Sequence, residues 1–325
     1  MLVGRGIVAL SDSVLVLRAL GLGDLLTAVP ALRALRRATL GCRIALAAPR
    51  QLAELVALID AVDELVPTER LGELWWDGAP PRLAVNLHGR GPRSIADLLA
   101  QRPGDILTHR HPSFLEVPGP VWSAEPHEVD RWCRLVEYAG MPADRTELGL
   151  AAPSVPSPAP GAIVVHPGAA YPARRWPTPR YAGVAAALRA AGHQVVVTGG
   201  AGERELAETV ASLAGLPAHA MLAGRIGLAG LAALVTDAKL VICGDTGVGH
   251  LATAYGAPSV LLFGPTPPGQ WGPPPERSRH RALWAGETGD PHSGQPSAGL
   301  LRLEEDEVLA EISAVLEAAS HGQLS

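Results

Sequence analysis

Residues 240–266 read LVICGDTGVGHLATAYGAPSVLLFGPT, two apolar segments separated by a glycine-rich turn and a helix-forming run. The first segment, Leu240–Cys243, and the last, Ser259–Phe263, have the length and apolar content of buried strands. Between them, Gly249–Tyr255 has the composition of a helix, and Gly256 follows where a left-handed glycine commonly ends one. Strand, helix and strand in this order predict a βαβ unit with parallel strands.

The same alternation extends through the rest of the chain. In the second half, strands are predicted at Ile163–His166 and Gln194–Thr198, and helices at Thr178–Ala191, Glu203–Leu213 and Leu228–Asp237. In the first half, strands are predicted at Val14–Arg18, Arg43–Ala48, Leu83–Leu87 and Asp105–Thr108, and helices at Leu25–Arg37, Gln51–Leu58, Ser94–Ala100 and Glu128–Tyr138. Pro30 predicts a kink or a restart in the first of these helices. The pattern is that of a doubly wound parallel α/β sheet in each half.

A proline-rich stretch separates the two halves. Residues 152–161 contain four prolines, which favour an extended linker. We therefore predict two Rossmann-like domains, at residues 1–151 and 162–300, with a ligand cleft between them. The last segment, 301–325, contains a predicted amphipathic helix, Glu305–Ala319, which we expect to pack back toward the first domain.

Composition argues against several classes of protein. The net charge of -5 does not suit a nucleic-acid-binding protein, because phosphate backbones select basic surfaces. Cys42, Cys133 and Cys243 form no CxxC pair, so we expect buried free thiols, with a reactive thiol as the alternative, and no disulfide framework or metal site. Neither a signal peptide nor a membrane-spanning apolar run is evident. We expect a cytoplasmic protein that touches a membrane at most peripherally.

The turn GDTGVGH at residues 244–250 is the most specific candidate ligand site. It precedes a helix, so the backbone N–H groups from Thr246 and Gly247 onward form an anion site that suits a pyrophosphate. Asp245 is placed to accept hydrogen bonds from sugar hydroxyls. His250 is placed to reach a phosphate, with a buried structural imidazole as the alternative.

Two further strand ends in the second half carry polar residues. His166 ends one predicted strand and is followed by Arg174, whose guanidinium offers several donors to phosphate oxygens. A solvated surface charge is the alternative for Arg174. Glu203 follows a glycine-rich turn and suits ribose hydroxyls, although the helix dipole also explains an acid at this position.

The first half offers a candidate base and a candidate acceptor surface. In the turn ALGLGD, Gly23 lets the backbone approach a ligand, and Asp24 is either a helix N-cap or a general base for an acceptor hydroxyl. In the loop VNLHGRGPRS, His88 and Arg90 follow a strand and are candidates to meet an anionic acceptor. Solvated loop charges explain these two residues nearly as well.

Together these motifs resemble glycosyltransferase family 9, the heptosyltransferases, which have the two-lobed GT-B fold. The segments LVLRALGLGDLLTAVPALRALRRA, VVHPGAAYPARRWP and VVVTGGAGERELAE occur with the GDTGVGH and FGPT turns in the family's order and cover most of the chain. The resemblance implies an inverting, metal-independent transfer of a heptose-like sugar. The donor it implies is a nucleotide-diphosphate sugar, with an ADP-sugar favoured, and the acceptor is a glycan or glycolipid hydroxyl. It also implies that residues 1–151 form the acceptor-side domain and residues 162–300 the nucleotide-sugar-binding domain.

The resemblance also implies a role for each matching residue. Asp24 falls on the family's catalytic base. The family's donor-binding residues fall on His166, Arg174, Glu203, Asp245, Thr246, Gly247 and His250, with Glu205 as a rival to Glu203. No cofactor and no metal are implied beyond the donor itself.

Departures from the family pattern leave other functions open. Leu20 and Gly21 stand where the family often has serine, so hydroxyl contacts to the donor or acceptor are missing there. Arg174 stands where the family usually has lysine, a chemical change that keeps the charge. A sugar-nucleotide epimerase of the same fold would convert the donor without an acceptor. A retired family member would bind nucleotide sugars without catalysis, but Asp24, Asp245 and His250 argue against it.

Overall fold

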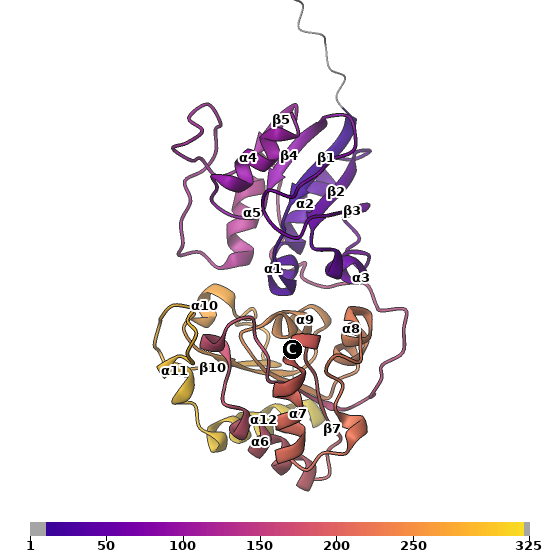
Figure 1. Ribbon diagram of the computed structural model, residues 1–325, viewed down its shortest axis with the longest axis vertical. Helices are drawn as coiled ribbons and strands as arrows, with labels where there is room; N and C mark the ends of the chain where they lie inside the picture. Colours follow the sequence, from indigo (N-terminus) through magenta and orange to yellow (C-terminus); the bar gives the residue numbers. More distant parts are fainter. Residues whose placement is uncertain (1–10, 322–325) are drawn as a thin grey trace, which may run out of the picture. The chain divides into compact units, whose positions relative to one another are not determined.

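The structure, a computed structural model, describes residues 11–321. The chain divides between Leu148 and Gly149 into two compact units, each built around its own parallel sheet (Figure 1). The prediction of two doubly wound α/β units is confirmed. The division falls a few residues before the predicted linker 152–161, which adopts neither helix nor strand and lies in the second unit. The N-terminal residues that bear on a signal peptide, 1–10, lie outside the described part.

Unit 1 (residues 1–148) has a five-stranded sheet with the order β3-β2-β1-β4-β5. Its strands are β1 (Ser11–Leu17), β2 (Arg43–Ala48), β3 (Glu64–Pro67), β4 (Pro81–Asn86) and β5 (Asp105–Leu107). Its helices are α1 (Leu22–Thr27), α2 (Val29–Ala38), η1 (Arg50–Leu52), α3 (Ala53–Val56), α4 (Arg93–Ala100) and α5 (Glu128–Tyr138). The order reverses between β1 and β4, and ligands bind such sheets beyond the carboxyl ends of the strands at the reversal.

Unit 2 (residues 149–325) has a second parallel sheet with the order β10-β9-β8-β6-β7. Its strands are β6 (Ile163–His166), β7 (Val195–Val197), β8 (Leu240–Gly244), β9 (Ser259–Phe263) and β10 (His280–Trp284). Its helices are η2 (Pro172–Arg174), α6 (Thr178–Ala190), η3 (Ala201–Glu203), α7 (Arg204–Leu213), η4 (Ala218–Ala220), α8 (Leu228–Thr236), α9 (Gly247–Tyr255), α10 (Pro268–Trp271), α11 (Ala298–Leu301) and α12 (Glu305–Ser320). Here the order reverses between β6 and β8.

The core of unit 2 includes the last helix. Strands β6, β8 and β9 are buried along their whole length, as in parallel sheets covered on both faces. Helix α12 contacts α6, β9 and β10, and its Val308, Ile312 and Val315 belong to the same hydrophobic cluster as the strands. The apolar face of α12 therefore completes the core of unit 2, and the expectation that the C-terminal segment packs back toward the first domain stays a prediction.

Two predicted features of the first half change in detail. The predicted helix Leu25–Arg37 is two helices, α1 and α2, because Pro30 occupies the first turn of α2 and the chain restarts after Ala28. Strands β3 and β10 are not predicted from the sequence. Both lie at an edge of their sheet, and β3 has a single buried residue, Val66, so neither carries a long apolar run.

The three thiols are free and buried, as predicted. Burial raises the pKa of Cys133 to about 12 and also raises the pKa of Cys243, so neither is a thiolate at neutral pH. Within residues 11–321, no three His, Cys, Asp or Glu side chains are grouped so that they could hold a metal ion. No helix in this part of the chain is long and apolar enough to cross a membrane.

Candidate functional site

The turn after β8 forms the start of α9. Thr246 is the N-cap residue, with extended backbone angles, and the helix begins at Gly247. The first N–H groups of a helix have no partner within it. The N–H of Gly249 donates to the carbonyl oxygen of Thr246 at 3.0 Å. The N–H groups of Gly247 and Val248 precede this bond and lie at the N-terminal end of the helix. This end of α9 is therefore suited to an anionic ligand.

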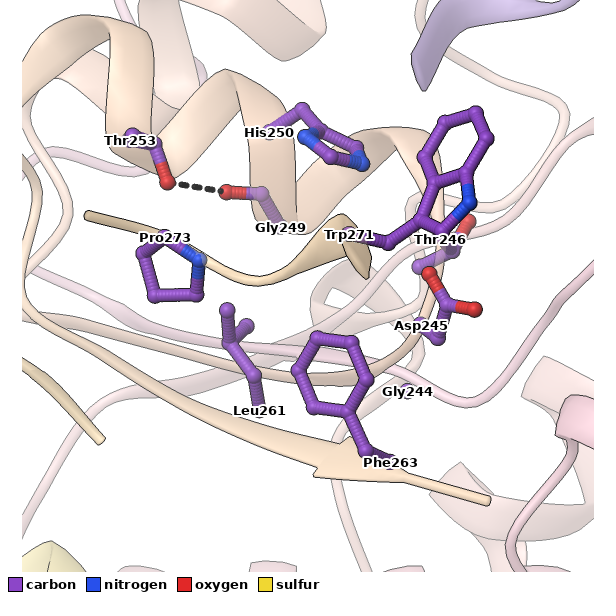
Figure 2. Close-up of a pocket in the computed structure, with 10 residues that line it drawn as sticks. All are labelled: Gly244, Asp245, Thr246, Gly249, His250, Thr253, Leu261, Phe263, Trp271 and Pro273. Carbon is purple, nitrogen blue, oxygen red and sulfur yellow. Dashed lines mark hydrogen bonds between the residues drawn. The ribbon is translucent and has the colours of Figure 1, made fainter. Parts of the chain in front are cut away.

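A small cavity lies behind this turn (Figure 2). Its volume of about 10 Å³ is room for a single water molecule. The residues around it are Gly244, Asp245, Thr246, Gly249, His250, Thr253, Leu261, Phe263, Trp271 and Pro273. The ring of Trp271 meets that of His250 edge-on, with centroids 5.8 Å apart. Trp271 of α10 is a site residue that the sequence reading missed; its only signal was an aromatic residue shortly after the FGPT turn.

Arg174 reaches the same turn from η2. Its Nη1 lies 3.8 Å from Oδ2 of Asp245, a carboxylate that is only 5% exposed. The Nε atom of Arg174 is buried and has no hydrogen-bond partner among the described residues, while the side chain as a whole is 23% exposed. The structure thus brings the predicted Arg174 and Asp245 together beside a helix N-terminus. A guanidinium in this position suits phosphate oxygens.

At Gly244 the backbone of β8 passes close to the backbone of Arg174. A Cβ at Gly244 would lie 2.7 Å from the carbonyl oxygen of Arg174, a distance that Cβ atoms do not adopt. We expect Gly244→Ala to lower the free energy of unfolding by about 1–3 kcal/mol, because the backbone must move to accept the methyl group. Urea denaturation measures this change. Gly202→Ala is the control, since a Cβ there meets nothing within 4 Å; equal stability of the two variants would contradict the prediction.

His166 and Glu203 lie together at the neighbouring strand ends. His166 pairs with Cys243 across β6 and β8, and its Nδ1 lies 3.0 Å from Oγ1 of Thr198. Its Nε2 is 3.8 Å from Oε2 of Glu203. Burial lowers the pKa of His166, although Glu203 opposes the shift, so the imidazole is neutral at pH 7 and this contact is not an ion pair.

Glu203 also serves the start of its own helix. Its Oε2 accepts a hydrogen bond of 2.8 Å from the backbone N–H of Gly200. A Cβ at Gly168 would lie 2.2 Å from the Glu203 carboxyl carbon, so the carboxylate is seated against the HPG turn. Glu205, by contrast, is exposed in the first turn of α7. Of the two acids, Glu203 is the one next to His166.

In unit 1, Asp24 is the third residue of α1. The N-cap of that helix is Gly21, so the alternative that Asp24 is the N-cap is wrong. The Asp24 side chain is 28% exposed, and its Oδ1 lies 3.6 Å from Nη2 of Arg18. The Nε of Arg18 donates to the Asp24 carbonyl oxygen at 2.6 Å. Asp24 is therefore held in place and still reachable from solvent.

Arg18, at the end of β1, is fully buried and organises this region. Its Nη2 donates to Oγ1 of Thr27 and to Oε1 of Glu128, each at 3.1 Å, and its Nη1 donates to the carbonyl oxygen of Leu87. Its guanidinium also lies over the Trp132 ring, 4.7 Å from the centroid. Sequence reasoning missed Arg18 as a site residue, although a charged residue directly after the apolar run Val14–Leu17 was the available signal.

Glu128, the first residue of α5, is the carboxylate partner of Arg18. It also accepts from Nε of Arg131 at 2.9 Å and from Nε1 of Trp132 at 2.8 Å. Burial alone would raise its pKa, but Arg18 and Arg131 outweigh burial and the pKa of Glu128 is lowered. A buried carboxylate thus links the Asp24 segment to α5.

The two predicted acceptor residues, His88 and Arg90, have different surroundings in unit 1. His88 is partly buried near Arg18, and its Nδ1 has no hydrogen-bond partner among the described residues. Burial, helped by the charge of Arg18, lowers the pKa of His88 to about 4, so its ring is neutral at pH 7. Arg90 is exposed and lines a separate hollow of unit 1. Gly23 is the second residue of α1, next to Asp24.

Comparisons with known proteins point in one direction. The family model of glycosyltransferase family 9 (heptosyltransferase) matches residues 117–296, more than half of the chain. Lipopolysaccharide heptosyltransferase 1 of Pseudomonas aeruginosa is 38% identical over 127 residues, which cover 39% of this chain and 34% of that protein. Lipopolysaccharide heptosyltransferase 2 of Escherichia coli is 32% identical over 158 residues, covering 46% and 45% respectively. The chain therefore matches less than half the length of these curated relatives.

Likeness of fold extends much further along the chain. The structure of the Escherichia coli ADP-heptose lipopolysaccharide heptosyltransferase II is similar over 95% of this chain and 99% of that one. The TM-score is 0.76 and the sequence identity is 22%, so this similarity establishes the fold.

Proposed function

The chain belongs to glycosyltransferase family 9, and on that premise we propose that it transfers a sugar from a nucleotide-diphosphate donor to a hydroxyl group of a glycan or glycolipid. The observation that carries the proposal is the cluster at the end of β8. There Arg174, whose side chain is 23% exposed, lies beside Asp245 and the N-terminus of α9. This combination is suited to a diphosphate with a sugar attached.

The donor that we propose is an ADP-sugar, with a heptose-like sugar. A similar fold belongs to a protein named for ADP-heptose, and this supports the choice of nucleotide. Asp245 would accept from sugar hydroxyls, Arg174 and the start of α9 would hold the diphosphate, and Glu203 would accept from the ribose. His166 and His250 would complete the donor site as neighbours of these groups.

We propose Asp24 as the general base of an inverting, metal-independent transfer. Its carboxylate takes the proton of the acceptor hydroxyl while that oxygen bonds to the anomeric carbon of the sugar. The bond from this carbon to the phosphate oxygen breaks, and the nucleoside diphosphate leaves with the electron pair. Arg174 and the α9 N-terminus offset the charge on the leaving group. His88, a neutral ring with an unpartnered nitrogen, would contact the acceptor.

Donor binding tests this assignment through Arg174. We expect Arg174→Ala to weaken ADP-sugar binding about 10- to 100-fold, because charge-assisted hydrogen bonds to the diphosphate are lost. Titration calorimetry with ADP-, GDP-, UDP- and TDP-sugars measures the affinities and identifies the nucleotide. The control is Arg189→Ala, an exposed arginine in the last turn of α6. Unchanged affinity in Arg174→Ala would remove Arg174 from the donor site.

Experiments on the wild-type protein distinguish the proposed transferase from the two alternatives, an epimerase and a retired family member. An epimerase would convert the sugar of the donor with no acceptor present, which NMR of the sugar nucleotide detects. A retired member would bind one nucleotide sugar and release no nucleoside diphosphate with any acceptor. Release that depends on an added acceptor supports the transferase.

A further inference from the structure

Arg18 fixes the main chain of Asp24. The carbonyl oxygen of Asp24 accepts a hydrogen bond from Nε of Arg18 at 2.6 Å and a second from Oγ1 of Thr27 at 3.0 Å. Thr27 in turn accepts from Nη2 of Arg18 at 3.1 Å. The side chain of Arg18 is fully buried, so this network is largely shielded from water and holds Asp24 at its place in α1.

Two carboxylates face the same nitrogen of Arg18. Nη2 of an arginine carries two N–H groups. Thr27 accepts one of them, and Oε1 of Glu128 accepts the other at 3.1 Å. Oδ1 of Asp24 lies 3.6 Å from this nitrogen, an ion-pair distance that is longer than a hydrogen bond. Glu128 is therefore the carboxylate that is hydrogen-bonded to Nη2, and Asp24 is the one that feels its charge.

Glu128 is itself fixed from the side of α5. Its Oε1 accepts from Nε1 of Trp132 at 2.8 Å, and its Oε2 accepts from Nε of Arg131 at 2.9 Å. Its side chain is only 9% exposed. Burial would raise the pKa of Glu128, but the two guanidiniums outweigh burial, so the carboxylate is charged at neutral pH.

The histidines around this cluster add no charge at pH 7. Burial and the charge of Arg18 lower the pKa of His88 to about 4, although Asp97 of α4 opposes the shift. Burial and the charge of Arg131 lower the pKa of His109 to about 4. Both rings are therefore neutral, and the charges that count are those of the arginines and carboxylates.

The charge of Glu128 decides how strongly Arg18 attracts Asp24. In the described part of the chain, the ion pairs of Arg18 are with these two carboxylates. With Glu128 ionised, the buried cation is already neutralised. Without that charge, Asp24 would be the remaining counter-ion, and Arg18 would oppose the uptake of a proton by its carboxylate.

We propose that Glu128 is a positioning residue for Asp24 and acts through Arg18. Its charge neutralises the guanidinium that fixes the Asp24 segment, so Arg18 holds the base in place without weakening it as a proton acceptor. The inference rests on the proposed role of Asp24 as general base and deepens it by naming the group that sets its strength.

Carbon-13 NMR of the Asp24 carboxyl group tests the proposal in the full-length protein without any substrate. The protein is labelled at aspartate, and the signal is assigned by its absence in Asp24→Asn. Glu128→Gln keeps the size of the side chain and removes its charge, so we expect the pH midpoint of Asp24 protonation to fall by about one unit. Glu128→Asp keeps the charge and should restore most of this shift. The matched control is Glu137→Gln in the same helix, because Glu137 pairs with Arg145 and not with Arg18.

Turnover links this charge to the reaction. With ADP-heptose and deacylated lipopolysaccharide as probes, Glu128→Gln should lower kcat about tenfold and leave the KM for the donor unchanged. In the Asp24→Asn background the same substitution should have no further effect on kcat, because the base that it serves is absent. Glu137→Gln should turn over at the wild-type rate.

Three results would overturn the inference and leave the proposed function standing. One is a wild-type midpoint for Asp24 in Glu128→Gln. Another is a shift in Glu128→Asp as large as in Glu128→Gln, since packing and not charge would then explain it. The third is a loss of kcat that recurs in full in the Asp24→Asn background. Wild-type turnover by Asp24→Asn alone would instead reject the base, and the inference with it. Thermal unfolding of each variant confirms that the compared proteins are folded.

Discussion

Asp24→Asn is expected to lower turnover about 10²- to 10⁴-fold, the usual contribution of a positioned general base. Asparagine keeps the shape of the side chain and its place in α1 but cannot take the proton of an acceptor hydroxyl. ADP-sugar affinity should stay the same, because the proposed donor contacts all come from unit 2. Release of nucleoside diphosphate at saturating donor and acceptor measures the first effect, and calorimetry measures the second.

A matched carboxylate separates this effect from a general change of charge. Asp77 is exposed in the same unit and lies outside the proposed site, so Asp77→Asn should turn over at the wild-type rate. If Asp24→Asn kept more than a tenth of wild-type turnover, another group would have to be the base. A fall in donor affinity equal to the fall in turnover would instead assign Asp24 to binding.

Glu128→Ala is expected to reduce the free energy of unfolding by about 3–5 kcal/mol, the cost of removing one member of a buried ion pair. The loss is large because Arg18 and Arg131 would remain buried without their carboxylate, and Nε1 of Trp132 would lose its acceptor. Urea denaturation at pH 7 measures it. Glu208→Ala is the control: its ion pair with Arg204 is exposed, so its loss should cost less than 1 kcal/mol.

The stabilisation by Glu128 should also depend on pH. The pKa of Glu128 is lower in the folded protein than its ordinary value of 4.5. A carboxylate with a lowered folded pKa stabilises the fold above its unfolded pKa and loses this contribution as the pH falls through the folded value. The stability difference between wild type and Glu128→Gln should therefore be constant from pH 7 to about pH 5 and shrink below about pH 4.5. A difference that does not change over this range would argue against an ionised Glu128.

Much of the fold is predictable because the buried strands are continuous apolar runs. The strands predicted at Ile163–His166 and Ser259–Phe263 begin and end at the same residues in the structure. Gly256 adopts the left-handed conformation expected at the end of α9. The edge strands β3 and β10 are different, since one side of an edge strand lacks a neighbour and its sequence need not be apolar throughout. The packing of α12 was also not predictable, because an apolar helix face does not say which core it covers.

In the candidate site, too, the sequence predicts some contacts and not others. Arg174 and Asp245 could be placed together because both follow strands that end at one sheet edge. The pair formed by Arg18 and Glu128 joins residues 110 positions apart, and no local pattern indicates such a contact. The sequence also allowed Asp24 to be the N-cap of the first helix. In the structure Gly21, three residues earlier, is the N-cap, and Asp24 lies within the first turn. The catalytic roles themselves remain predictions that the substitutions above will test.

The buried thiols have a practical consequence, since each one reports when the structure around it opens. Cys133 lies in unit 1 and Cys243 in unit 2, and neither is accessible or ionised while its surroundings are intact. Alkylation must therefore wait for a local opening event, and its rate follows the free energy of that event. Peptide mass spectrometry after timed labelling can thus follow the breathing of the two halves separately, in the natural chain and without an added probe.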